Sequence, residues 1–233
     1  LEEAIKNVDV SGSVVYRYNN SDNTQNQPSD QRENNNYKIG LNLSSKVNDY
    51  VKFNSRFIVG SPDDGGFAVL NSSKGATPAG NAQGDVQADV TLSNAYFGFT
   101  AIPNTVVNIG KQGLTTPYTV AVDINGNEQT GTGILALSTF GPITAGAGYF
   151  NATNLADSGN GASARITPDH KGIIDNGYDM YVATVQGDLD FVKLEAWYAG
   201  MQNTFGSYTL AATSNLDLAE NAKLGLEARY VNL

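Results

Sequence analysis

The chain has 233 residues and carries 14 Lys and Arg against 23 Asp and Glu, a formal net charge of −9. This acidic balance argues against nucleic acid as a partner, because phosphate backbones are bound by clustered basic side chains. The chain has no Cys, which excludes disulfide frameworks and Cys-based zinc sites. No stretch approaches the roughly 18–20 continuous apolar residues of a membrane-spanning helix. No charged-then-apolar leader is present either, so we expect that a signal peptide has already been removed.

The dominant pattern is an alternation of apolar and polar residues with a period of two. In segment 8–18, Val10 and Val14 fall on one face, whereas Ser13 and Arg17 fall on the other. Successive side chains of a strand point to opposite faces, so this pattern predicts a strand with one apolar and one polar side. The pattern recurs and predicts about eleven strands, near 8–18, 37–46, 50–60, 89–101, 104–112, 133–140, 142–151, 178–187, 189–199, 207–217 and 222–232.

The connections between these strands alternate in length. Short ones are expected at 47–49, 102–103, 141–142, 187–188 and 219–221, and long ones at 19–36, 61–88, 113–132 and 152–177. Long loops at one end and short turns at the other are typical of a transmembrane barrel with its turns in the periplasm. Strands of about ten residues also match a tilted crossing of the bilayer. We therefore predict an all-β fold, a transmembrane antiparallel β-barrel in the bacterial outer membrane.

A soluble β-sandwich or soluble barrel would show the same alternation with its apolar face turned inward. Two features count against it. Charged residues recur in mid-strand on the polar face, where a wide, wet lumen would hold them. Aromatic residues also gather near the expected strand ends, as interfacial girdles do; they are Tyr16, Tyr18, Tyr37, Tyr50, Phe97, Phe99, Tyr149, Tyr198 and Tyr230.

Several segments resemble a known family. Residues 1–12, Leu-Glu-Glu-Ala-Ile-Lys-Asn-Val-Asp-Val-Ser-Gly, resemble the mature N-terminus of the Campylobacter-type (epsilonproteobacterial) major outer membrane protein, a porin. Further similar segments are Tyr16-Arg17-Tyr18, Gly110-Lys111-Gln112 with Leu114 and Thr116, and Gly131-Thr132-Gly133. The resemblance implies a trimeric porin barrel of roughly 16–18 strands. It also implies passage of small hydrophilic solutes and ions, surroundings of lipid and lipopolysaccharide, and a calcium ion held by acidic residues in the channel.

Eleven strands cannot close a barrel of that size. We therefore expect residues 1–233 to be a single barrel domain that is incomplete at its C-terminus. A smaller barrel of ten or twelve strands is the alternative, since bacterial single-chain barrels have even strand numbers. The resemblance identifies 113–132 as the third, inward-folded loop that constricts the pore.

A constriction needs charged groups on its walls, because rings of fixed charge at a narrow point set ion preference. The candidate bases lie on polar faces of predicted strands or at the start of the third loop; they are Arg17, Lys38, Lys52, Arg56, Arg229 and Lys111. The candidate acids are Asp123 and Glu128 in the loop. The alternative interpretation is that these are solvated charges without a special role.

Segment 123–128 gathers hard oxygen ligands at a spacing of two, which suits calcium. The family resemblance places an aspartate of this loop among the calcium ligands, and Asp123 is the nearest match, with Asp157 as a second candidate. The alternative is a polar turn around an Asn-Gly dipeptide.

The resulting functional hypothesis is passive diffusion through a cation-preferring pore, without catalysis. The single His, His170, lies in a polar loop and is not expected to form a catalytic site. The rival hypothesis is an adhesin or receptor barrel, whose loops 19–36, 61–88 and 152–177 would bind a host or phage partner.

Overall fold

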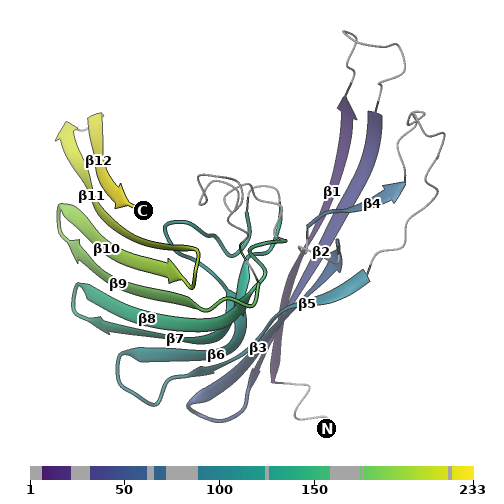
Figure 1. Cartoon of the computed structure of the whole chain (residues 1–233), viewed down its shortest axis with the longest axis horizontal. Helices are drawn as coiled ribbons and strands as arrows, with labels where there is room; N and C mark the ends of the chain where they lie inside the picture. The colour runs from purple at the N-terminus through teal and green to yellow at the C-terminus, as the bar shows by residue number, and fades with distance from the viewer. Residues whose placement is uncertain are drawn as a thin grey trace.

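The chain folds as one curved antiparallel sheet (Figure 1) in a computed structural model that describes residues 7–21, 32–61, 66–71, 89–123, 126–157, 174, 176–219 and 222–233. Eleven strands follow one another along the sheet in chain order, except that the short β4 lies off this path and pairs with β2. The strands are β1 Val8–Ser21, β2 Arg32–Lys46, β3 Val51–Gly60, β4 Ala68–Asn71, β5 Asp89–Phe99, β6 Thr105–Gly113, β7 Thr130–Phe140, β8 Ile143–Thr153, β9 Met180–Leu189, β10 Val192–Met201, β11 Phe205–Ala219 and β12 Ala222–Asn232. None of the described segments contains a helix long and apolar enough to cross a membrane.

Every strand that the alternation predicts is present, with ends that differ by a few residues. The additional strand β4 lies inside the segment expected to be a long loop, 61–88, and pairs with the outer end of β2. Its sequence, Ala-Val-Leu-Asn, is four residues long and shows no alternation. Periodicity therefore could not have revealed β4, because its existence depends on the partner strand.

The register places apolar side chains on one face of the sheet and most polar ones on the other. Val10 lies opposite Leu43, and Ile109 lies opposite Ile134, on the outer face. Asn42 lies opposite Arg56 on the concave face. Figure 1 shows the sheet curving into an open trough, and we call its concave face the lumenal face.

Aromatic pairs lie at both ends of the outer face. Phe53 and Phe97 are in contact beside the short turns, with ring centroids 5.1 Å apart. At the end with long connections, the ring centroids of Tyr149 and Tyr181 are 5.4 Å apart, and a second pair is formed by Tyr208 and Tyr230. These positions agree with the two aromatic belts of a transmembrane barrel.

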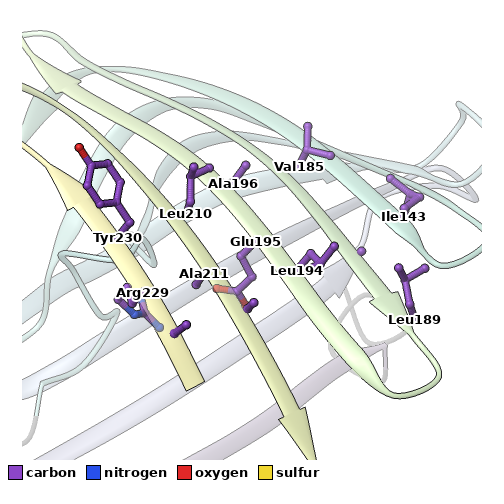
Figure 2. Close-up of a pocket in the computed structure, with 13 residues that line it drawn as sticks. Ile143, Val185, Leu189, Leu194, Glu195, Ala196, Leu210, Ala211, Arg229 and Tyr230 are labelled. Atoms are coloured by element: carbon purple, nitrogen blue, oxygen red, sulfur yellow. The ribbon is translucent and has the colours of Figure 1, made fainter. Parts of the chain in front are cut away.

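Between these belts the outer face is aliphatic. A shallow groove of about 620 Å³ runs across β8–β12 on this face. Figure 2 shows Ile143, Val185, Leu194 and Leu210, which come from four neighbouring strands and line the groove. Apolar side chains that alternate with a polar lumenal face are what contact with lipid requires.

Candidate functional site

The connection between β6 and β7 folds over the lumenal face instead of continuing the strands. We call residues 114–129 the inward loop; the structure describes all of it except residues 124 and 125. Its two limbs hold each other through backbone hydrogen bonds. Leu114 N donates to Gln129 O at 2.9 Å, and Gln129 N donates to Ala121 O at 3.0 Å. Within the predicted loop 113–132, the described residues 114–123 and 126–129 form two limbs, whereas residues 113 and 130–132 belong to strands β6 and β7.

The first limb is attached to the wall formed by β8–β11. Leu114 is buried in an apolar cluster with Phe150 and Met180. Tyr118 reaches further, where its hydroxyl hydrogen-bonds Ser207 Oγ and lies 2.8 Å from Thr209 Oγ1 on β11. Apolar burial therefore fixes the depth of this limb, and the hydroxyl group fixes its position along β11.

The second limb is attached to β2 and β3 on the other side of the trough through Glu128. Lys38 Nζ donates to Glu128 Oε1 at 2.6 Å, and Arg56 Nη2 donates to the same oxygen at 3.0 Å. Ser93 Oγ donates to Glu128 Oε2 at 3.1 Å. The side chains of Glu128, Lys38 and Arg56 are 4%, 6% and 17% exposed, respectively. This network is a buried, charge-assisted joint between the inward loop and the barrel wall.

Local irregularities of the sheet make room for the Glu128 network. The β3–β5 register shifts next to Arg56, which is opposite Asn94, so that Ser93 has no register partner. This bulge lets Ser93 reach Glu128 from a position that strict alternation would assign to the outer face. Gly40 lies under the Arg56 guanidinium, and a Cβ there would stand 2.9 Å from Nη2. A side chain at position 40 would therefore displace the guanidinium.

Asp123 is buried at the tip of the loop and is bonded within a turn. Its Oδ1 accepts from Asn127 N at 2.8 Å, and its Oδ2 accepts from Asn127 Nδ2 at 3.0 Å. Gly126 supports the turn with a φ of 86°. The other proposed ligand, Asp157, is exposed and accepts a hydrogen bond from the Asn176 side chain. The hydrogen bonds between Asp123 and Asn127 form the polar turn that the sequence offered as the alternative to a calcium site.

The fit of calcium can be judged from the donor set. Calcium takes 6–8 oxygen ligands, and the described residues contain no group of three or more His, Asp or Glu side chains placed to hold a metal. Asp123 provides one carboxylate, whose two oxygens already accept hydrogen bonds from Asn127. Calcium binding at Asp123 therefore stays a prediction.

The remaining predicted bases lie in three different environments. Arg17 faces the lumen and stacks on Phe67, with its Cζ 4.1 Å from the ring centroid. Lys52 lines a hollow near the short turns. Arg229 is on the lumenal face of β12, where its Nη2 lies 3.0 Å from Glu227 Oε1. Of the predicted bases, therefore, Lys38 and Arg56 alone contact Glu128 among the described ion pairs.

The structure corrects the placement of Lys111. It lies opposite Ala95 and Thr132, on the same face of β6 as Ile109, which is the outer face. Its Nζ donates to Leu92 O at 3.1 Å. Lys111 therefore does not line the lumen as expected, because its neighbour Gln112 takes the lumenal position. The alternation of β6 itself carried this signal.

The sequence did not indicate the residues that help to attach the two limbs of the inward loop to the barrel wall. Tyr118 had no distinguishing neighbour pattern, and Ser207 and Thr209 read as ordinary strand residues. The hydrogen bond between Ser93 and Glu128 depends on a β-bulge, and no sequence pattern predicts that bulge. His170, which is not expected to be catalytic, and much of the long loops proposed for adhesion lie outside the described residues.

Comparison with solved structures identifies the fold. The chain resembles OccAB3 of Acinetobacter baumannii, with a TM-score of 0.68, 10% identity, and coverage of 97% of this chain and 57% of that one. It also resembles OccK8 (OprE) of Pseudomonas aeruginosa, with a TM-score of 0.65, 17% identity, and coverage of 96% and 54%. For OpdL of Pseudomonas aeruginosa the TM-score is 0.57 at 15% identity, with coverage of 96% and 53%. The fold is thus that of an outer-membrane porin barrel, and the chain spans about half the length of these structures.

The family follows from the sequence. The model of the Campylobacter major outer membrane protein family matches residues 1–232. The chain therefore belongs to this family, which confirms the resemblance seen in its first residues and its location in the bacterial outer membrane. No curated protein matches the chain.

Proposed function

We propose that the full-length protein is a porin that lets small hydrophilic solutes and ions diffuse across the outer membrane, without catalysis. The observation that carries this proposal is the path of the inward loop. One limb is joined to β11 through Tyr118 and the other to β2 and β3 through Glu128, so the loop crosses the trough from side to side. A loop held across the lumen narrows the passage at a defined depth.

Cation preference is the finer part of this proposal. Its first support is the net charge of −9. Its second support is that Lys38 and Arg56 share the carboxylate of Glu128. Glu128 therefore offsets one of the two positive charges that these wall bases bring to the lumen, because opposite charges a few ångströms apart largely cancel at a distance.

We further propose that the assembly is a homotrimer surrounded by lipid and lipopolysaccharide. The family resemblance motivates the trimer. The aliphatic outer face, with aromatic pairs at both ends, supports the contact with lipid. Size-exclusion chromatography with light scattering in detergent tests the trimer, and a monomeric mass would contradict it.

Planar bilayer recordings of the full-length protein test the function. We expect stepwise insertion of open channels and a reversal potential, in a salt gradient, of the sign that cation preference requires. Steps with a reversal potential of the opposite sign would overturn cation preference and leave the porin intact. Verified insertion into the bilayer without any conductance would overturn the porin proposal itself.

A further inference from the structure

One part of the lumenal face is apolar, against the pattern of the rest. Leu135 and Leu137 of β7 lie opposite Gly148 and Gly146 of β8, respectively. Gly146 in turn lies opposite Thr184 of β9, and Thr184 lies opposite Trp197 of β10. Val182, opposite Gly148, belongs to the same surface. We call Leu135, Leu137, Val182 and Trp197 the apolar patch. On β2–β5 the equivalent lumenal positions carry polar or charged side chains, among them Asn42, Asn54 and Asn94.

The glycines opposite the patch shape its surface. A Cβ at Gly146 would stand 2.4 Å from Leu137 Cδ2. At Gly148 it would stand 2.9 Å from Val182 Cγ2 and 3.0 Å from Leu135 Cδ1. The leucine and valine side chains therefore lie across the glycine positions instead of standing into the lumen. The result is a flat apolar surface, which suits contact with a planar group.

Above this surface lies a cavity of about 570 Å³. The first limb of the inward loop forms part of its wall through Leu114, Thr115 and Thr116. Its polar lining consists of uncharged amides and hydroxyls, contributed by Asn94, Tyr96, Asn108, Gln112, Thr115, Thr116, Thr144, Thr184 and Gln186. None of the described residues that line the cavity is charged. Binding sites of this size typically combine an apolar surface with a few placed polar groups.

Attachment of the inward loop does not account for the whole patch. The buried cluster that holds the loop contains Leu114, Phe150, Met180 and Val182, and Leu135 packs against it. Leu137 and Trp197 belong to the cavity lining but not to this cluster. Leu137 and Trp197 are both half-buried on the lumenal face of the sheet, and a ligand with an apolar face would cover the part of them that the loop leaves open.

We propose that this cavity is a transit site for small aromatic solutes that carry neutral hydrogen-bonding groups. The ring lies against Leu137 and Trp197, and a polar group of the lining such as the Asn108 amide binds its substituents. This inference rests on the proposed porin function, since it adds a solute class to the same lumen. Aromatic solutes bind more strongly than aliphatic ones here because ring-on-ring contact adds to the burial of apolar area.

Single-channel recording of the full-length protein provides the test, with 4-hydroxybenzamide as aromatic probe and xylitol as aliphatic probe of similar size and no charge. We expect resolvable current blockades with the aromatic probe and none with xylitol. Trp197→Ala should shorten the mean blockade time roughly threefold to tenfold, because the loss of one aromatic contact weakens binding by about that factor. The matched control is Tyr198→Ala on the same strand, because its side chain points to the outer face and should leave the blockades unchanged.

Fluorescence supplies a second readout that does not depend on conductance. Trp197 is the single Trp of this chain, so the emission of the parent minus that of Trp197→Phe reports on the cavity. We expect 4-hydroxybenzamide to quench this difference and xylitol to leave it unchanged. Open channels with equal responses to both probes, or no quenching, would overturn the site and leave the porin function standing. Absence of channels together with quenching would overturn the porin function alone.

Discussion

The joint at Glu128 offers the sharpest test of how the inward loop is held. Glu128→Gln keeps the shape of the side chain and removes its charge, which leaves Lys38 and Arg56 without their carboxylate. The three groups are nearly enclosed, with the Glu128 side chain 4% exposed. Water therefore cannot take over the lost interactions without moving the loop.

Two buried cations reach the carboxylate, through Lys38 Nζ and through the Nε and Nη2 atoms of Arg56. The Gln amide keeps one acceptor oxygen, but it carries no charge and its nitrogen cannot accept a hydrogen bond. Removing one partner of a buried ion pair costs about 3–5 kcal/mol, so we expect a loss of about 3 kcal/mol, the lower end of this range. It corresponds to a change of roughly a hundredfold in the ratio of attached to detached loop.

Single-channel recording measures the effect as conductance and open-channel noise. We expect Glu128→Gln to raise the noise and to add a second, higher conductance level as the second limb detaches. Glu227→Gln is the matched control, because its ion pair with Arg229 has a similar length of 3.0 Å but a Glu side chain that is 54% exposed. Such a pair contributes about 0–1 kcal/mol. Identical conductance and noise in Glu128→Gln and the parent would refute the assignment of Glu128 as the joint.

Four further predictions concern single side chains. Tyr118→Phe removes the hydroxyl that hydrogen-bonds on β11. We expect the attachment of the first limb to lose about 1–3 kcal/mol, because the hydrogen-bond partners on β11 are left unsatisfied, and we expect open-channel noise to rise. Noise at the parent level would contradict the attachment of the first limb through Tyr118. Lys111→Gln should leave the reversal potential unchanged because this side chain lies on the outer face, and a shift in that potential would disprove the placement. Asp123→Asn should abolish any change in thermal stability caused by a calcium chelator in the parent, and a parent insensitive to chelator would remove calcium from the proposal. The hydrogen bond and charge of Lys46 hold the pKa of Asp49 below its ordinary value of 3.8, so the stabilisation is present above that pH and is lost as pH falls through the lowered pKa. Lys46→Gln should raise this pKa in an NMR titration, and an unchanged value would show that the contact is not formed in solution.

The sequence by itself determined the strands and their two faces. Alternation with a period of two is a local property, because successive side chains of any extended chain point to opposite sides. For this reason Val10 and Val14 could be assigned to the outer face, and Arg17 to the lumenal face, from β1 alone. Lengths of strands and connections then indicated a barrel in a bilayer. The first twelve residues indicated the family, which the match over residues 1–232 confirmed.

The tertiary structure decided which of these residues meet. Glu128 and Lys38 are 90 positions apart, and Tyr118 and Thr209 are 91 positions apart. Contacts at such separation depend on sheet curvature and on the path of the inward loop, neither of which leaves a local pattern. The same holds for Ser93, which reaches Glu128 because a bulge in the β3–β5 register interrupts the alternation. Periodicity assigns a side chain to one face of the sheet. Only the folded structure brings side chains that are distant in the sequence to within hydrogen-bonding distance of one another.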